Sequence, residues 1–311
     1  MKYCFIINPG SNHNKSARFI PLLLAELDRR KLDYEYQLTT SLNDARQLSQ
    51  TANEQGYDVV VAVGGDGTIN RVINGFYDEN GRRNSNARLG VIHTGTSPDF
   101  CKSYGIPTQP LIALETLLKG HSKAITIART EYHTQAGERR IGYFACCANV
   151  GLGAQVARTS NQGIRKYLGD GLGTFASILI ALCGYRPSNL PLLCDGKAVV
   201  VKNNFNTFIG KTMYVASGMK VVHDLTDADE RLYVLSLKQL NLLNIVPALR
   251  AIYSGKANYD KHYLSFYYAR SIEIMQGHTN NEMEFDGDPR GFLPCRIAIA
   301  PDKLELIVNE L

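Results

Sequence analysis

The fold is decided by the stretch Val59–Asn70, which reads VVVAVGGDGTIN. Its opening apolar run is short and continuous, which is typical of a buried parallel β-strand. The glycines that follow let the backbone approach phosphate oxygens closely, and a helix starting at the turn would add free N–H groups and a partial positive charge. The pattern therefore favours a phosphate-binding turn over the simpler alternative, a Gly-Asp-Gly β-turn capped by Thr68.

The acidic residue inside this turn, Asp66, needs an explanation of its own because its charge repels phosphate. Carboxylates in phosphoryl-transfer enzymes hold Mg²⁺ beside the nucleotide, directly or through water. We therefore expect Asp66 to hold Mg²⁺ next to a bound nucleotide.

Strand-like and helix-like segments alternate on both sides of the turn. The spacing of apolar residues predicts strands and helices in turn over Tyr3–Asn8, Ser16–Arg30, Asp33–Thr39, Asn43–Glu54, Asp58–Val63, Ile69–Phe76 and Leu89–Ile92. This order indicates a doubly wound, Rossmann-like parallel sheet with helices on both faces and ligands at the carboxyl ends of its strands.

The pattern changes near Lys123, after which short strands predominate. They are expected at Ala124–Thr130, Gly142–Asn149, Ala198–Val201, Thr212–Val215, Leu232–Leu237, Tyr263–Tyr268 and Ile272–Met275. Helices are expected near Ile164–Cys183 and Leu240–Ser254. The chain is thus predicted to join an α/β nucleotide-binding domain, residues 1–123, to a β-rich antiparallel, sandwich-like substrate domain, residues 124–300, with a strand in 301–311 returning to the first domain.

The composition excludes several classes of protein. With 311 residues, 44% hydrophobic and 20% charged, the chain is long and apolar enough for two globular domains. Seven cysteines without regular spacing exclude a disulfide framework, and the apolar runs are too short for a signal peptide or a membrane span. We therefore expect a cytoplasmic protein that contacts a membrane only peripherally, at its inner face.

The net charge of +5 fits a nucleotide, an anionic membrane or a nucleic acid equally well. Nucleic acid is disfavoured because no basic residues are interleaved with the aromatic run Tyr263–Tyr268. The segment Gly163–Cys183 has a basic start and an apolar end, a pattern that suits docking on an anionic bilayer but is more often a helix packed on its own domain.

The motif GGDGTIN, followed by Val72-Ile73-Asn74-Gly75, resembles the nucleotide-binding signature of the diacylglycerol-kinase catalytic family, which includes sphingosine kinases and bacterial soluble lipid kinases. The GGDG element also occurs in NAD kinases and, more loosely, in phosphofructokinases. Asn8-Pro9 and Phe285-Asp286-Gly287 match the lipid-kinase branch rather than the NAD kinases.

The resemblance implies an ATP-dependent kinase that phosphorylates a hydroxyl group of a lipid such as diacylglycerol, with ATP and Mg²⁺ as cofactors. The residues it places on the nucleotide are Asn8, Thr39, Gly64, Gly65, Asp66, Gly67, Thr68, Ile69, Asn70, Gly95 and Thr96. Asp66 and Asp99 are expected to carry the magnesium, and Asp229 corresponds to an acid of the family's structural-metal turn. Enzymes of this family are often dimers, and a homodimer is an open expectation for this chain.

The catalytic carboxylates that the resemblance implies are Asp66 and Asp288. The family has Asp-Gly-Glu near its C-terminus, with the Glu as the proposed general base on the acceptor hydroxyl, and by position this role falls on Asp288. The alternative is an ordinary hairpin turn, because Asp-Gly is a strong hairpin signal.

Several departures from the family pattern leave alternatives open. Arg71 stands where the family usually has Glu, Pro98 replaces an Asn, and Tyr233 replaces an acid of the structural-metal turn. Besides a lipid kinase, the sequence is compatible with a kinase of a soluble hydroxyl compound, NAD included, or with a nucleotide-binding protein that has lost catalysis.

Overall fold

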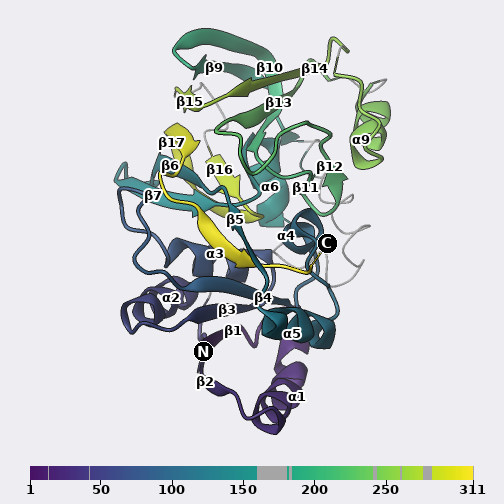
Figure 1. The fold of residues 1–311 in the computed structure, drawn as a ribbon. Helices are drawn as coiled ribbons and strands as arrows, with labels where there is room; N and C mark the ends of the chain where they lie inside the picture. The colour runs from purple at the N-terminus through teal and green to yellow at the C-terminus, as the bar shows by residue number, and fades with distance from the viewer. Residues whose placement is uncertain are drawn as a thin grey trace. The chain divides into compact units, whose positions relative to one another are not determined.

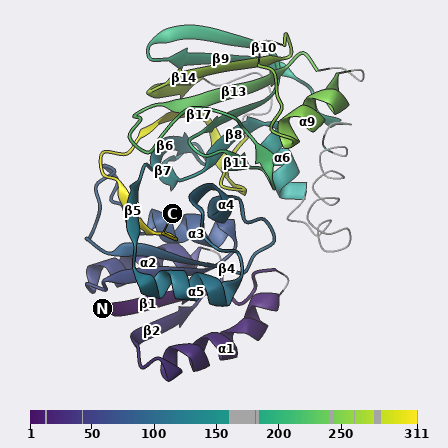
Figure 2. The same ribbon diagram turned by 45° about the vertical axis from the view of Figure 1, so that its right-hand side comes forward.

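The computed structural model describes residues 1–12, 14–41, 43–159, 181, 184–240, 244–259, 261–275 and 282–310. The chain divides into two compact units (Figures 1 and 2). The N-terminal unit comprises Met1–Ile127 together with Ala300–Leu311, and the C-terminal unit comprises Ala128–Ile299. The division follows Ile127, a few residues beyond the boundary expected after residue 123.

The N-terminal unit is built on a six-stranded sheet of order β2-β1-β3-β4-β18-β5. The strands are β1 (Lys2–Ile7), β2 (Asp33–Leu38), β3 (Val59–Gly64), β4 (Arg88–His93), β5 (Ser122–Ile125) and β18 (Leu304–Ile307). Strands β1 to β4 and β18 run parallel, and β5 pairs antiparallel with β18. The continuous apolar run of β3 is explained by its central place, because every residue from Val59 to Gly64 is buried.

Helices cover both faces of this sheet. They are α1 (Lys15–Arg29), α2 (Asp44–Glu54), α3 (Asp66–Asn74), α4 (Asp99–Tyr104) and α5 (Pro110–Lys119). Leu23 of α1 and Leu117 of α5 pack with Phe5 and Val61 of the sheet in one core. Helices α2 and α3 pack together against the opposite face of β1 and β3 (Figure 1). The expected doubly wound arrangement is confirmed.

A strand from the other end of the sequence completes this sheet. Leu306 of β18 lies beside Leu89 of β4, and β18 pairs along its length with β5. Just before β18, the main-chain oxygen of Asp302 accepts a hydrogen bond from Tyr77 Oη at 3.0 Å, and its carboxylate accepts one from the N–H of Arg83 at 2.9 Å. These bonds fix the start of the returning strand to the loop that precedes β4.

The C-terminal unit contains an antiparallel ten-stranded sheet with the path β14-β13-β10-β8-β16-β17-β15-β9 and with β6 and β7 attached to β17. Its strands are β6 (Ala128–His133), β7 (Arg139–Phe144), β8 (Cys147–Gly151), β9 (Ser188–Cys194), β10 (Lys197–Gly210), β13 (Leu232–Lys238), β14 (Leu264–Ala269), β15 (Ser271–Ile274), β16 (Glu282–Phe285) and β17 (Asp288–Ile299). A small hairpin, β11 (Tyr214–Val215) and β12 (Met219–Lys220), and two helices, α6 (Leu152–Thr159) and α9 (Ile245–Tyr253), accompany them.

The long strand β10 closes this sheet on itself. Its first half pairs with β9, and its second half pairs with β8 and β13. The strands β10, β8, β16, β17, β15 and β9 therefore form a ring around a core that includes Val150, Phe285 and Ile297. The expected β-rich antiparallel domain is confirmed, and its form is that of a barrel or sandwich.

Some expected elements differ in the structure. The single strand expected at Ala124–Thr130 is divided between β5 and β6, and the one expected at Gly142–Asn149 is interrupted at Ala145-Cys146, where the chain turns between β7 and β8. The helix expected at Ile164–Cys183 lies outside the described residues apart from position 181. Within the described residues, no helix is long and apolar enough to cross a membrane.

The glycine that ends the nucleotide-binding signature is predicted to be required for helix packing. A Cβ atom on Gly75 would lie 2.5 Å from Ser49 Cβ and 2.6 Å from the main-chain oxygen of Arg46. Gly75→Ala should therefore lower the free energy of unfolding, measured in urea, by about 1–3 kcal/mol. Gly184→Ala is the matched control, because no atom of the described part of the chain lies within 4 Å of its Cβ position. Equal stability of the two variants would contradict the prediction.

Candidate active site

The residues expected to bind a nucleotide lie at one edge of the N-terminal sheet, at the carboxyl ends of four adjacent strands. Asn8 follows β1, Thr39 follows β2, Gly64 ends β3 and His93 ends β4. The chain passes from β1 to β2 on one side and from β3 to β4 on the other, so this edge contains the topological switch point. Open α/β sheets bind their ligands at that position.

The two predicted phosphate turns touch each other through their main chains. A Cβ atom on Gly95 would lie 2.4 Å from the Cα atom of Gly65, so a side chain at Gly95 would push the turns apart, and a Cβ atom on Gly65 would lie 3.3 Å from the Cα atom of Gly95. The N–H of Thr94 donates to the main-chain oxygen of Gly64 at 2.9 Å. The turns after β3 and β4 thus form one continuous backbone surface, in which Gly65 and Gly95 remain partly exposed.

The first turn leads directly into α3. The extended residue Gly65 precedes the helix, and its main-chain oxygen accepts the N–H groups of Thr68 at 2.9 Å and Ile69 at 3.0 Å. Asn8 fixes the same helix end, because its Nδ2 donates to Thr68 Oγ1 at 2.9 Å. The amino end of α3, with its partial positive charge, is therefore held at the switch point, where an anion would be stabilised.

Not every predicted nucleotide residue is exposed at this edge. Asp66 and Gly67 are partly exposed and Thr96 is exposed, whereas the side chain of Ile69 packs in the core. Asn70 is fully buried and its main-chain oxygen accepts a hydrogen bond from the Asn74 amide at 2.8 Å.

The buried Thr39 donates its N–H to the main-chain oxygen of Ile7 at 2.9 Å, which aligns the ends of β2 and β1. Like Ile69 and Asn70, Thr39 shapes the site in this structure. Contact of these three residues with a nucleotide stays a prediction.

Asp66, in the partly exposed first turn, is bonded to the main chain of Asp99, a residue that is 5% exposed. The N–H of Asp99, at the start of α4, donates to Asp66 Oδ2 at 3.1 Å. His93 is also part of this group, because its Nε2 lies 3.6 Å from Asp66 Oδ1 and 3.1 Å from the main-chain oxygen of Ser97. His93 is not among the residues predicted for the site, because no local pattern in the sequence connects it with Asp66.

The acidic pair suits Mg²⁺ held next to phosphate. Mg²⁺ is usually bound by one or two carboxylates and completes its shell with water and substrate phosphates. No cluster of three or more His, Cys, Asp or Glu side chains that could hold a metal occurs among the described residues. Asp66 and Asp99 therefore provide a donor set of the size that Mg²⁺ uses when a nucleotide supplies the remaining oxygens.

In the C-terminal unit, Asp286 and Gly287 form the two-residue turn of the β16–β17 hairpin. Both have positive φ, 51° and 81°, as a type I′ turn requires. The Asp286 carboxylate accepts hydrogen bonds from the N–H groups of Ala145 at 3.1 Å, Cys146 at 3.0 Å and Cys147 at 3.1 Å. These bonds explain why the strand expected at Gly142–Asn149 is interrupted.

This hairpin presents the predicted base. Asp288 follows the turn directly, and its Oδ2 lies 3.3 Å from Nε of Arg290, whose guanidinium lies 5.0 Å from the centre of the Phe285 ring. The Asp288 side chain retains 15% exposure. The hairpin turn of this motif is therefore confirmed, and the role of Asp288 as a base stays a prediction.

A second carboxyl group, Glu284, lies in the same hairpin and was not singled out from the sequence. It is 4% exposed, and it accepts hydrogen bonds from the N–H of Gly287 at 2.8 Å and from Nδ2 of Asn149. Burial raises the pKa of Glu284 to about 8. The two hydrogen bonds oppose this rise, and the charges of Asp286 and Asp288 add to it.

The third expected metal residue, Asp229, is engaged by other parts of the chain. Its Oδ2 accepts the N–H of Thr226 at 2.9 Å, and its Oδ1 lies 2.7 Å from Nη2 of Arg231, interactions that lower the pKa of Asp229. The buried Lys211 ammonium donates to the main-chain oxygens of Asp229 and Arg231. Two cationic side chains thus hold this turn, and a metal at Asp229 stays a prediction.

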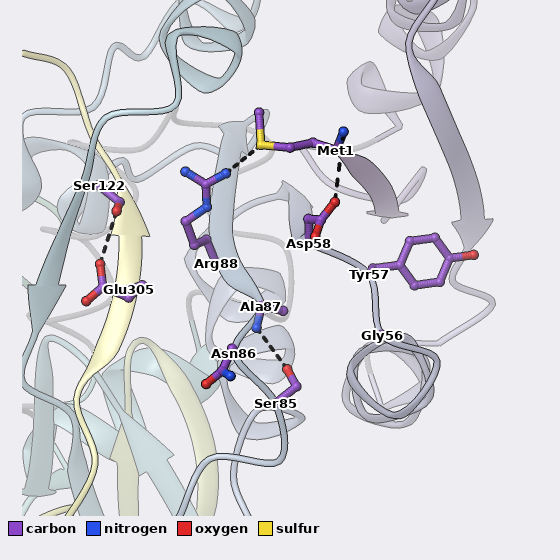
Figure 3. A pocket seen from close by; sticks show the side chains of 10 residues that line it. All are labelled: Met1, Gly56, Tyr57, Asp58, Ser85, Asn86, Ala87, Arg88, Ser122 and Glu305. Carbon is purple, nitrogen blue, oxygen red and sulfur yellow. Dashed lines mark hydrogen bonds and ion pairs between the residues drawn. The ribbon is translucent and has the colours of Figure 1, made fainter.

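A pocket of about 430 Å³ lies at the opposite edge of the N-terminal sheet, around the amino ends of β1, β3 and β4 (Figure 3). Its charged side chains are engaged by neighbouring main-chain and hydroxyl groups. Asp58 accepts the N–H of Lys2, Arg88 donates to the main-chain oxygen of Gly120, and Ser122 donates to Glu305. The pocket is separate from the glycine turns, and the chemistry described above does not involve it.

From the raised pKa of Glu284 we predict how the free energy of unfolding changes with pH. Its pKa when folded, about 8, exceeds the ordinary value of 4.5, so the folded state keeps a proton that the unfolded state loses. This contribution to stability is complete below about pH 4.5 and is lost as the pH rises through about 8, by up to about 1.4 kcal/mol per pH unit. Urea unfolding should be measured for wild type and Glu284→Gln across this pH range. The free energy of unfolding of wild type should fall with rising pH, and that of the variant should lack this part of the fall. Parallel slopes would contradict the assignment.

Comparison with families of known proteins identifies both units. The model of the diacylglycerol kinase catalytic domain matches residues 2–130, and the model of the YegS C-terminal NAD kinase beta sandwich-like domain matches residues 147–308. A diacylglycerol kinase of Staphylococcus aureus (strain MRSA252) is 26% identical over 300 residues, which cover 93% of this chain and 87% of the relative.

Solved structures show the same fold. The crystal structure of a diacylglycerol kinase from Bacillus anthracis str. Sterne matches with a TM-score of 0.67 and 19% identity, covering 99% of this chain and 97% of the other. Yeast NADH kinase complexed with NADH matches with a TM-score of 0.59 and 9% identity, covering 100% of this chain and 84% of the other. At these identities the likeness establishes the fold alone.

Proposed function

Because the chain belongs to the family that joins a diacylglycerol kinase catalytic domain to a YegS C-terminal domain, we propose that it transfers the γ-phosphoryl group of ATP to a hydroxyl group of a lipid such as diacylglycerol. The family resemblance inferred from the sequence is thereby confirmed. The lipid acceptor, the use of Mg²⁺ and the roles of individual residues belong to the proposal.

The observation that carries the proposal is the contact between the turns at Gly65 and Gly95. It forms a side-chain-free surface at the switch point of the sheet, beside the amino end of α3. Backbone N–H groups and a helix dipole stabilise phosphate there, and Asp66 and Asp99 add a place for a cation. A cation held by these two carboxylates would neutralise the charge of the β- and γ-phosphates.

In this proposal the chain's own residues position the nucleotide and the acceptor hydroxyl. The turns hold the phosphates, and Asn8 holds the start of α3 through Thr68. We assign the acceptor hydroxyl to Asp288, whose carboxylate can take the hydroxyl proton as the phosphoryl group passes from ATP to the hydroxyl oxygen. Phosphoryl transfer depends mainly on such positioning and on electrostatics, so Arg71 and Pro98 do not remove any group that the reaction requires.

ATP binding should depend on the contact between the turns. Gly95→Ala introduces a Cβ atom 2.4 Å from the Gly65 Cα atom, a clash with main chain that only separation of the turns relieves. The dissociation constant for ATP, measured by isothermal titration calorimetry, is expected to rise by about tenfold or more. Gly184→Ala serves as the matched control. Unchanged affinity in Gly95→Ala would remove these turns from the ATP site.

Transfer itself is tested with γ-labelled ATP and Mg²⁺ added to a total lipid extract, whose products are separated by chromatography. A labelled lipid should form with wild type and decrease by about 100-fold or more in Asp66→Asn, which loses the anionic ligand. Asp33→Asn is the matched control, because Asp33 is exposed at the amino end of β2, away from the turns. Full activity of Asp66→Asn would remove Asp66 from the mechanism.

The same assay separates the remaining alternatives. Label that enters only a soluble hydroxyl compound, NAD included, would replace the lipid with a soluble acceptor. ATP binding without transfer to any acceptor would indicate a binding protein that has lost catalysis, and would make Arg71→Glu and Pro98→Asn the next variants to test.

A further inference from the structure

A row of three buried polar side chains crosses three neighbouring strands of the C-terminal unit. Asn206 of β10, Asn149 of β8 and Glu284 of β16 are each at most 4% exposed. Asn206 Nδ2 donates to Asn149 Oδ1 at 3.1 Å, and Asn149 Nδ2 donates to Glu284 Oε1. Glu284 and Asn149 are direct partners in the β8–β16 register, so the strand pairing itself brings them together.

A main-chain N–H group stands at each end of this row. At one end, Gly153 in the first turn of α6 donates to Asn206 Oδ1 at 2.8 Å. At the other end, Gly287 in the hairpin turn donates to Glu284 Oε2 at 2.8 Å. Helix α6 also contacts β16, and the row connects the two elements through hydrogen bonds (Figure 1).

These ends fix the direction of every hydrogen bond in the row. An amide N–H can only donate, so Asn206 must accept from Gly153 and donate to Asn149, which must in turn donate to Glu284. Glu284 therefore receives one donor from Asn149 and a second from Gly287. An ionised carboxylate accepts strongly from both donors, whereas an amide would direct a hydrogen at one of them, and a protonated carboxyl group would accept one of the two bonds only through its weaker hydroxyl oxygen.

The bond to Gly287 has a particular consequence. Gly287 is the second residue of the type I′ turn and directly precedes Asp288, so Glu284 tethers the turn from inside while Asp286 tethers it to the N–H groups of Ala145–Cys147. We propose that Glu284 is a positioning residue, which as the ionised end of the row fixes the turn that presents Asp288 to the acceptor hydroxyl. The inference rests on the proposed function only for the role of Asp288.

The charged and titratable groups around Glu284 make this positioning depend on pH. Asp286 of the turn and Asp288 of β17 disfavour its ionisation, and the Cys147 thiol of β8 is also nearby, with Arg290 of β17 paired to Asp288. Because the pKa of Glu284 is about 8, its ionised form, which accepts the two bonds most strongly, predominates only in the alkaline range. The kcat of wild type should therefore rise as the pH passes through about 8.

The first test is Glu284→Gln, which keeps the shape and loses the second acceptor. At about pH 9, where Glu284 is ionised, kcat should fall by about tenfold to 100-fold while the KM for ATP stays unchanged. At about pH 6.5 the difference should shrink, because a protonated Glu284 holds the two donors less strongly than the carboxylate does. Glu282→Gln, the same change on the same strand outside the row, should leave kcat and its pH profile as in wild type.

The decisive test moves the carboxylate one position along the row. The double variant combines Asn149→Asp with Glu284→Gln. In it the carboxylate at position 149 accepts one hydrogen bond from the Asn206 amide and one from the new amide at position 284. The oxygen of that new amide accepts the hydrogen bond from the N–H of Gly287. Every donor again has an acceptor, so kcat should recover most of the loss. Asn149→Asp alone places two carboxylates face to face and should be impaired, so that only the pair of changes restores activity.

Hydrogen exchange of the amides of residues 286–288 gives a readout that needs no turnover. At about pH 9 the exchange of these amides should be faster in Glu284→Gln than in wild type. In the double variant the exchange rate should return to that of wild type. Unchanged exchange in Glu284→Gln, or a double variant no better than either single one, would overturn the proposal. A wild-type protein that transfers no phosphate would refute the proposed function instead, while exchange would still decide whether Glu284 holds the turn.

Discussion

The N-terminal unit depends on one constraint, the close approach of two main chains at Gly65 and Gly95. A Cβ atom at the second of these positions would lie 2.4 Å from the Cα atom of the first, so a side chain at Gly95 would clash with the main chain of the other turn. This contact places the end of β3, the start of α3 and the end of β4 around one backbone surface. The acidic pair of Asp66 and Asp99 lies within the same segments, since Asp66 begins α3 and Asp99 begins α4. The proposed phosphate site and the proposed cation site therefore depend on a single packing arrangement.

Carboxylates are used in different ways across the molecule, and their surroundings explain the differences. The Asp286 carboxylate accepts hydrogen bonds from three main-chain N–H groups and shapes a turn, whereas the Asp229 carboxylate is bonded to Thr226 and Arg231. Asp288 keeps some exposure beside Arg290, and Glu284 is buried as the acceptor for two donors. Acids that look interchangeable in the sequence thus divide into structural ones and ones that remain accessible to a ligand.

Local patterns were sufficient to predict the fold class, the returning strand and the location of the glycine turns. The apolar run Val59–Val63 and the GGDG motif are local signals, and a parallel sheet then places the ends of its strands together. His93 and Glu284 could not be found in this way, because their importance comes from partners far away in the sequence, Asp66 and Asn149. Helix α5 was missed because apolar residues occupy most of its positions and obscure its periodicity.

The returning strand β18 has a consequence for how the molecule is made. It lies between β4 and β5 in the N-terminal sheet, yet its residues follow the entire C-terminal unit along the chain. During synthesis β4 and β5 therefore leave the ribosome without the strand that separates them, and β4 carries an unpaired edge until Leu304–Ile307 emerge. The nucleotide-binding sheet, although it begins at the first residues, is completed last.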